Sequence, residues 1–339
     1  MGAKVKALRT FYIFWSTQSL SQLGSSITAF ALTLWLYEKT GSSLSTASLA
    51  ICSYAPYVLT SIFAGALTDR LDKKKTMLVC DTLAAFTTLA VFGLYKTDSL
   101  QAWHLYAINM LSGLMNSVQQ PASEVAMTLI IPKEYYQKTS GLQSLSRSLI
   151  SILNPLIATA LYGLTGLNAV IALDLASFAV AFTALAVLIR LPRTSEGAGD
   201  SVLALAREGI AFLRKTPLVL ALILFMAGVN LVASAFDAVL PGYVIPNPRG
   251  GTVMLGILTS TAGIGMAVGS IIVSALPKPK DRVRVVYLTM LFSLGTENFL
   301  LAFSRQPLIW CIGQVVGWIP ALSRKSWKFK VAALRPRLV

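Results

Sequence analysis

Five ionisable residues lie inside long apolar stretches of the sequence, where a charge is costly unless it has a partner or a task. They are Asp81, Arg147, Asp174, Asp237 and Glu297. An acidic group in a nonpolar setting can bind and release a proton, and an acid–base pair can break and re-form during a conformational change. These are the residues in which the sequence predicts chemistry.

Their positions lead to different expectations. Asp81 lies little more than one helical turn beyond a lysine cluster, and we expect it to pair with Arg147 in a structural or gating ion pair. Asp174 and Asp237 are predicted near the outer ends of their helices. For Asp174 a solvated helix end is the simpler interpretation.

Asp237 is the favoured candidate for a proton carrier, because it shares a helix face with Asn230. Glu297 is predicted in the outer half of a later apolar segment. There an interfacial residue, or one satisfied by a neighbouring partner, is the simpler interpretation.

Uncharged polar residues recur at helical spacing within other apolar stretches. Helical spacing places such residues on one face, where they either line a wet path or form hydrogen bonds between helices, and both readings stay open. The candidates for a cavity lining are Gln18, Gln22, Ser25, Asn109, Asn116, Asn154 and Asn230.

Other kinds of chemistry find little support. The single histidine, His104, stands beside Trp103 in a setting typical of a membrane interface, and no metal site is expected. The three cysteines fall in apolar stretches without CxxC spacing. The sequence contains no P-loop and no GxSxG motif, which argues against an ATP-driven pump or a membrane hydrolase.

The segments that position these residues are those of a membrane protein. Of 339 residues 55% are hydrophobic and 13% charged, and the mean hydropathy is +0.67. Apolar runs long enough to cross a bilayer as helices recur along the chain. We expect ten spans, at residues 11–37, 44–67, 76–95, 101–120, 139–164, 167–190, 217–243, 252–276, 284–303 and 307–320.

The formal net charge of +15 follows the loops of this pattern. Lysine and arginine gather before the first predicted span and after the second, fourth, sixth and eighth. The intervening loops hold only Lys39, Lys96, Arg249 and Arg305. By the positive-inside rule the N-terminus is cytoplasmic, so the charge indicates topology and not nucleic-acid binding.

Residues 65–75, GALTDRLDKKK, form a short segment rich in charged residues between two apolar runs. Gly65 would let two helices approach closely, and Asp69 and Arg70 fall where a helix is expected to end with unpaired carbonyl groups. The three lysines are expected to contact anionic lipid headgroups.

This stretch resembles the loop between the second and third helices of the major facilitator superfamily, G-x-L-x-D-R-x-G-[RK]-[RK]. Asp72 stands where the family prefers glycine. The resemblance implies a latch that holds the cytoplasmic ends of two halves together; a plain basic stop-transfer loop is the alternative. The latch cluster comprises Gly65, Leu67, Asp69, Arg70, Lys73 and Lys74.

Two further segments are similar to the macrolide-efflux and siderophore-exporter branch of that superfamily. They are FWSTQSLSQLGSSITAFALTLWLYEKTGS in the first span and IALDLASF at 171–178. The resemblance covers about residues 9 to 320. It implies an all-α integral membrane bundle with a six-span N-terminal half at 1–190, a cytoplasmic linker with a surface helix at 191–216, and an incomplete C-terminal half at 217–320.

The fifth span carries only half of the glycine motif known in proton-coupled exporters of the superfamily. Gly141 and Pro155 match, whereas Ile150, Asn154, Ala158 and Thr159 replace its other glycines. Pro155 is expected to kink this helix.

The resemblance implies a secondary transporter of the inner membrane that exports a bulky amphipathic compound, such as a macrolide-like drug or a siderophore, in exchange for protons. It implies no cofactor and no nucleic-acid partner; the bilayer, a small-molecule substrate and protons are the expected partners. An uptake symporter of the same fold, and a membrane enzyme or inert scaffold, are the alternatives.

The last segment, 321–339, departs from the family pattern. It is a basic tail with no acidic residue between 324 and 337, expected to lie in the cytoplasm against lipid. A full member of the family would add two more helices. The sequence therefore suggests a truncated chain that inserts with ten spans and transports poorly, if at all, as a monomer.

Overall fold

The fold is known from a computed structural model, which describes residues 2–131, 133–189, 191, 211, 213–275, 292–293, 295–296, 299–304 and 306–318. Its secondary structure is helical, with no strand among the described residues. The chain divides into two compact units. One contains Met1–Gln143 and Leu161–Gly242, and the other contains Ser144–Ala160 and Tyr243–Val339.

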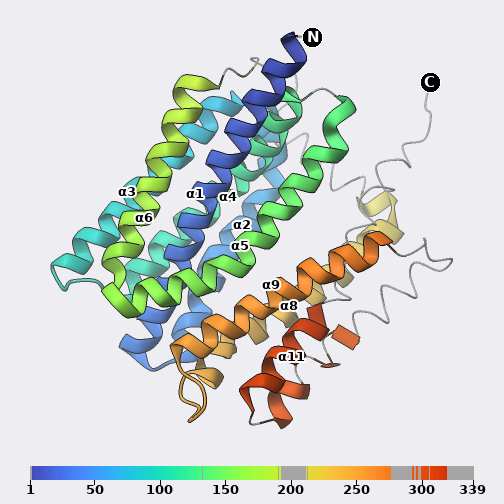
Figure 1. Ribbon diagram of the computed structural model, residues 1–339. Helices are drawn as coiled ribbons and strands as arrows, with labels where there is room; N and C mark the ends of the chain where they lie inside the picture. The colour runs from blue at the N-terminus through green and yellow to red at the C-terminus, as the bar shows by residue number, and fades with distance from the viewer. Residues whose placement is uncertain are drawn as a thin grey trace. The chain divides into compact units, whose positions relative to one another are not determined.

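The first unit is a bundle of long helices. Within it α2 packs along α4, α1 packs along α6, and α3 contacts both α4 and α6 (Figure 1). A five-residue π-helical turn, Ala184–Leu188, ends the sixth helix. The helices are α1 (Gly2–Thr40), α2 (Ser43–Arg70), α3 (Lys73–Lys96), α4 (Ala102–Ile130) and α6 (Leu167–Thr183).

Local chemistry sets several helix ends in this unit. The Asp72 side chain accepts a hydrogen bond of 3.1 Å from the backbone N–H of Lys75 and so caps the start of α3. His104 Nδ1 accepts one of 3.1 Å from the backbone N–H of Gln101, which gives the only histidine a capping role at the start of α4. Gly166, with φ of +63°, makes the reversal into α6 that a side chain would oppose.

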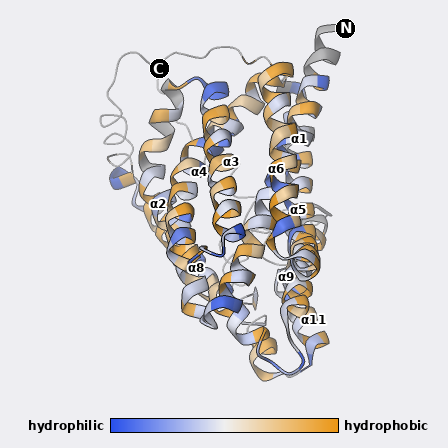
Figure 2. Cartoon of the chain, turned by 90° about the vertical axis from the view of Figure 1, so that its left-hand side faces the viewer, coloured by the Kyte–Doolittle hydropathy of each residue, from blue (hydrophilic) through white to orange (hydrophobic). Residues whose placement is uncertain are grey.

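A compact apolar cluster joins the beginnings of α1 and α3 to α4 and the end of the sixth helix. Its members are fully or almost fully buried: Phe14, Met77, Ala122, Ala126, Leu185 and Ile189. Elsewhere apolar residues extend along the helices with hydrophilic residues interspersed (Figure 2). Many large apolar side chains stay exposed, which fits helices that face lipid.

The second unit is built on α9 (Thr252–Ala275) and α11 (Pro307–Trp318), which lie side by side (Figure 1). Gly265 is a contact point between them, since a Cβ at this position would meet the backbone of Val315. The middle of α5 (Tyr136–Thr165) belongs to this unit as well. There Gly256 and Gly263 of α9 lie against α5, because added Cβ atoms would meet Thr159 and Ser151.

Helix α8 (Pro217–Val244) is exposed along most of its length. Its carboxyl-terminal end lies against the start of α2, where a Cβ on Gly242 would meet the Ser43 side chain. The Thr46 hydroxyl reaches the carbonyl of Ala238 at 3.5 Å.

The predicted spans agree with the helices over most of the chain, and two boundaries need correction. α1 begins at Gly2, and α4 continues to Ile130, ten residues beyond the predicted end. Pro121 did not stop α4, because a proline inside a membrane helix loses only local hydrogen bonds that neighbouring groups can replace. Most of the predicted span at 284–303 and of the linker at 191–216 lies outside the described residues, as do Glu297 and the tail.

Five helices of the described part are long and apolar enough to cross a membrane. They are Lys73–Lys96, Gly141–Thr165, Leu167–Leu188, Val219–Val244 and Thr252–Gly269. α1, α2 and α4 are longer than any of these five segments, and polar residues interrupt their apolar runs. The expected total of ten spans stays a prediction, as does the division into two halves.

Candidate functional site

A buried carboxylate lies where α1, α3 and α6 meet. Asp174 of α6 is only 5% exposed. Its Oδ1 accepts a hydrogen bond of 3.0 Å from the Ser25 hydroxyl of α1, and its Oδ2 accepts one of 3.2 Å from the Thr88 hydroxyl of α3. The expectation of a solvated helix end at Asp174 was wrong, because packing of α1 and α3 covers this turn of α6.

A third hydroxyl faces the same group. Thr28, one turn after Ser25 on α1, is 6% exposed and lies close to the Asp174 carboxyl. Its Oγ1 makes no hydrogen bond among the described residues. We name Asp174, Ser25, Thr28 and Thr88 the Asp174 site.

A glycine makes this site possible. A Cβ at Gly24 would collide with Ser177 Oγ and come within 3.2 Å of the Asp174 backbone. The helices α1 and α6 therefore approach at a residue without a side chain. The Ser177 hydroxyl points back to its own helix, where it donates a hydrogen bond of 2.9 Å to the backbone carbonyl of Asp174.

Asp81, on α3, is the second buried carboxylate of the first unit, with 8% exposure. Its Oδ1 accepts a hydrogen bond from Gln119 Nε2 of α4, whereas its Oδ2 has none among the described residues. The Gln18 amide of α1 lies close to the same carboxyl group. Arg147 is exposed and belongs to the second unit, so its pairing with Asp81 stays a prediction.

The latch cluster begins in the last turns of α2 and continues into α3. Gly65, Asp69 and Arg70 belong to α2, which ends at Arg70, and their side chains are outside the described set. Leu67 is 37% exposed and Lys73 only 5%.

Lys74 makes the best-defined contact of the latch cluster. Its Nζ donates to the carbonyl oxygens of Ala186 and Ile189, at 2.9 and 2.7 Å. These carbonyls end the sixth helix and its π-helical turn, where backbone acceptors lack partners within the helix. The expectation that the three lysines face lipid is therefore wrong for Lys73 and Lys74, which are held by protein, while Lys75 is exposed.

The predicted cavity residues have varied surroundings. Gln22 and Asn116 are exposed. The Asn109 side chain donates a hydrogen bond of 2.9 Å to the backbone carbonyl of Leu105 in its own helix. In the second unit the Asn154 Oδ1 is buried without a hydrogen bond among the described residues, beside a buried Pro155. Asn230 and Asp237 are both exposed on α8, and the lining of a cavity by these residues stays a prediction.

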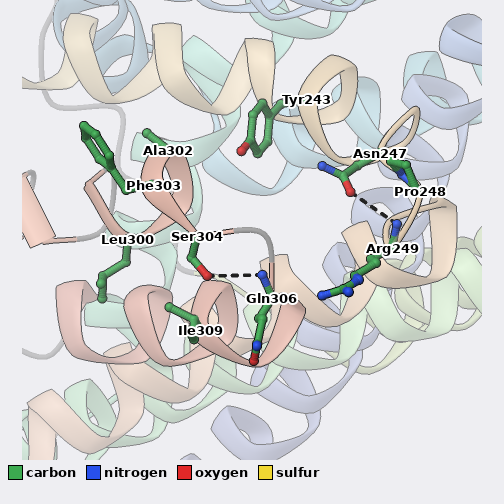
Figure 3. A pocket seen from close by; sticks show the side chains of 10 residues that line it. All are labelled: Tyr243, Asn247, Pro248, Arg249, Leu300, Ala302, Phe303, Ser304, Gln306 and Ile309. Atoms are coloured by element: carbon green, nitrogen blue, oxygen red, sulfur yellow. Dashed lines mark hydrogen bonds between the residues drawn. The ribbon is translucent and has the colours of Figure 1, made fainter.

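A cavity of about 1070 Å³ in the second unit was not anticipated from the sequence (Figure 3). Tyr243, Asn247 and Arg249 line one side, and Phe303 and Gln306 lie across from them. The Tyr243 hydroxyl donates a hydrogen bond of 2.9 Å to the backbone carbonyl of Leu301, which links the two sides of the cavity. Its residues come from helix ends and from the turns between them, so no single periodic pattern marks them.

Sequence reasoning also missed Thr28, Thr88 and Gly24 as parts of a site. One signal was available: Ser25 and Thr28 are three residues apart on α1, a spacing that places both on one face of a helix. Among the described residues no group of three histidines, cysteines or carboxylates is arranged to hold a metal ion.

Long apolar helices that enclose isolated carboxylates define the class: this is a multi-pass membrane protein. Residues 14–322 match the model of the Major Facilitator Superfamily, and the chain belongs to that family of transporters. The resemblance noted from residues 65–75 is thereby confirmed at the level of the family.

Several of the relatives that the chain matches are efflux proteins. The chain is 27% identical to macrolide efflux protein A of Streptococcus pyogenes over 285 residues, which cover 81% of this chain and 69% of that protein. It is 24% identical to the multidrug efflux pump Tap of Mycolicibacterium fortuitum over 314 residues, 87% of this chain and 74% of the pump.

Solved structures share the fold. A bacterial homologue of the iron transporter ferroportin, in an inward-facing state, aligns with a TM-score of 0.70 at 16% identity, covering 97% of this chain and 85% of that one. A bacterial homologue of the lysosomal transporter Spinster aligns with a TM-score of 0.67 at 15% identity, covering 95% and 74%. At such identities the likeness concerns the fold alone.

Proposed function

We propose that the protein exports a bulky amphipathic compound, such as a macrolide-like drug or a siderophore, and that proton influx drives the export. The observation that carries this proposal is the relation to macrolide efflux protein A along 81% of the chain. The relation to a multidrug efflux pump supports the same direction of transport.

Exposed polar groups on otherwise apolar helices support a route for such a compound. Gln22 on α1, Asn116 on α4 and Asn230 on α8 are exposed amides. In the family pattern the first, fourth, seventh and tenth of the twelve helices surround the central cavity. Amides and hydroxyls on apolar walls suit a substrate that is itself largely apolar and binds by shape.

The latch cluster is proposed to control the opening of the transporter toward the cytoplasm. Lys74 joins the start of α3 to the end of the sixth helix, so a movement of one is transmitted to the other. The cluster would then act between conformations and leave the folding of single helices unaffected. With the N-terminus in the cytoplasm, this cluster lies on the inner side of the cell membrane.

Transport in everted membrane vesicles tests the function and its direction. Vesicles that contain the full chain should take up ethidium and erythromycin when a proton gradient, acidic inside, is imposed, and a protonophore should abolish the uptake. Uptake in right-side-out vesicles instead would favour a symporter and contradict export. Transport that ignores the proton gradient would contradict proton coupling while leaving export in place.

A further inference from the structure

We propose that Asp174 is the residue that binds the coupling proton, and that Ser25, Thr28 and Thr88 are the groups that solvate it in both protonation states. This inference rests on the proposed proton-coupled export and names the site that serves it. The sequence favoured Asp237 for the task. The structure gives Asp174 surroundings that Asp237 does not have among the described residues.

The donor set suits a group that alternates between charged and neutral. A hydroxyl can donate to a carboxylate and accept from a carboxylic acid. The Ser25 and Thr88 hydroxyls contact different oxygens of Asp174, at 3.0 and 3.2 Å. Thr28 brings a third hydroxyl close to the carboxyl, buried and without a hydrogen bond of its own among the described residues. A proton can therefore arrive or leave with only rotation of hydroxyl groups.

The charged groups around the site do not neutralise Asp174. Among the elements packed on it, α1 carries no charged residue between Arg9 and Glu38, and α6 carries none besides Asp174. On α3 the nearest cation to Thr88 in sequence is Lys96, which is exposed and roughly 12 Å farther along the helix at 1.5 Å per residue.

Between Arg9 and Glu38 on α1, and between Lys75 and Lys96 on α3, the titratable side chains are an acid and groups that are ordinarily neutral near pH 7. Asp81 lies about two turns before Thr88 on α3 and adds negative charge. Cys80 and Tyr95 on α3 and Tyr12 and Tyr37 on α1 contribute none. Since a buried carboxylate without a cation is unfavourable in a membrane, a bound proton is the available means of neutralising Asp174.

Ser25 supplies a connection from the buried carboxyl to the exposed face of α1. The Ser25 residue is exposed, as is Gln22 one turn before it, whereas Asp174 is buried. The residue whose hydroxyl contacts Asp174 is thus itself exposed, on the face of α1 where the cavity is predicted. Asp81 is held by an amide instead, and no amide or hydroxyl contacts the exposed Asp237 among the described residues.

Infrared difference spectroscopy of the purified full chain in lipid nanodiscs tests this proposal without transport. Between low and high pH, the wild-type protein should show the C=O stretching band of a protonated carboxyl group. Asp174→Asn should remove that band, while Asp81→Asn and Asp237→Asn, as matched carboxyl controls, should keep it. Ser25→Ala should shift its frequency, because the frequency reports the hydrogen bonds of the carboxyl.

An unchanged band in Asp174→Asn, or a band lost only in Asp81→Asn or Asp237→Asn, would overturn the proposal. Should Asp174→Asn not fold, the Ser25→Ala and Thr88→Val spectra decide: a band that neither variant shifts does not belong to this site. The vesicle assay distinguishes a failure of the Asp174 assignment from a failure of the proposed proton-driven export. Proton-driven uptake without the Asp174 band would overturn the assignment of the residue, and the band without proton-driven uptake would overturn the proposed function.

Discussion

Ser25 and Asp174, which are 149 residues apart in the chain, are joined by a hydrogen bond of 3.0 Å between the first and sixth helices. The contact exists because Gly24 lets α1 approach the backbone of α6 at Asp174. One close approach therefore buries a carboxylate and supplies it with a hydroxyl.

We expect Gly24→Val to destabilise the protein. The new side chain would meet Ser177 and the Asp174 backbone, and overpacking of this kind costs about 1–3 kcal/mol. Thermal unfolding of the purified chain should show a lower midpoint. Gly93→Val on α3 is the control, because nothing lies within 4 Å of a Cβ there. Equal midpoints for the two variants would show that the α1–α6 approach is not tight.

Lys74→Met is expected to lower the stability of the protein and to slow transport. It removes two hydrogen bonds from an ammonium group to the end of the sixth helix, each of a kind worth roughly 1.5–3 kcal/mol. Thermal unfolding and substrate turnover measure the two effects. Lys75→Met removes the same charge from an exposed neighbour and should change neither by a comparable amount. Identical behaviour of both variants would leave the general positive charge as the cause.

The latch prediction concerns the other members of the latch cluster. Asp69→Asn, Arg70→Ala and Gly65→Val should each reduce turnover while the amount of protein in the membrane stays at the wild-type level. Reduction is expected because the cluster acts between conformations. Turnover assayed at matched expression checks this. Wild-type turnover in all three variants would remove the latch interpretation and favour a plain basic loop.

The hydrogen bond between Gln119 and Asp81 should appear as an energetic coupling between α3 and α4. A double-mutant cycle with Gln119→Leu and Asp81→Leu is expected to give an interaction free energy of about 0.5–3 kcal/mol, read from unfolding of the four proteins. Gln120→Leu, on the exposed side of α4, serves as the comparison. Additive effects of Gln119→Leu and Asp81→Leu would indicate that this contact contributes nothing measurable.

Cysteine accessibility tests the orientation of the chain. A cysteine in place of Lys75 should react with a membrane-impermeant maleimide only in everted vesicles, and one in place of Asp98 only in intact cells. The two positions are exposed and mark opposite ends of α3, Lys75 in its first turn and Asp98 two residues beyond its last. The assay needs a background without the native cysteines Cys52, Cys80 and Cys311. The reverse pattern would place the N-terminus outside and move the latch cluster to the outer face.

The sequence by itself determined the class of protein and most helix positions. Long apolar runs fold as helices in a bilayer because each backbone group must find its partner within the segment, and this requirement is local. The register of GALTDRLDKKK pointed to the family for a similar reason, since a loop motif is a local pattern. The sequence did not predict that α4 continues past Pro121, because a proline normally marks the end of a helix.

The tertiary structure alone decided which polar groups belong together. Asp174, Ser25 and Thr88 come from three helices far apart in the chain, and helical spacing within each says nothing about the register between them. Lys74 likewise looked like a lipid contact until the sixth helix was seen to end beside it. A side chain in a membrane protein is buried or exposed according to the neighbouring helix, and that neighbour is chosen by packing over the whole bundle.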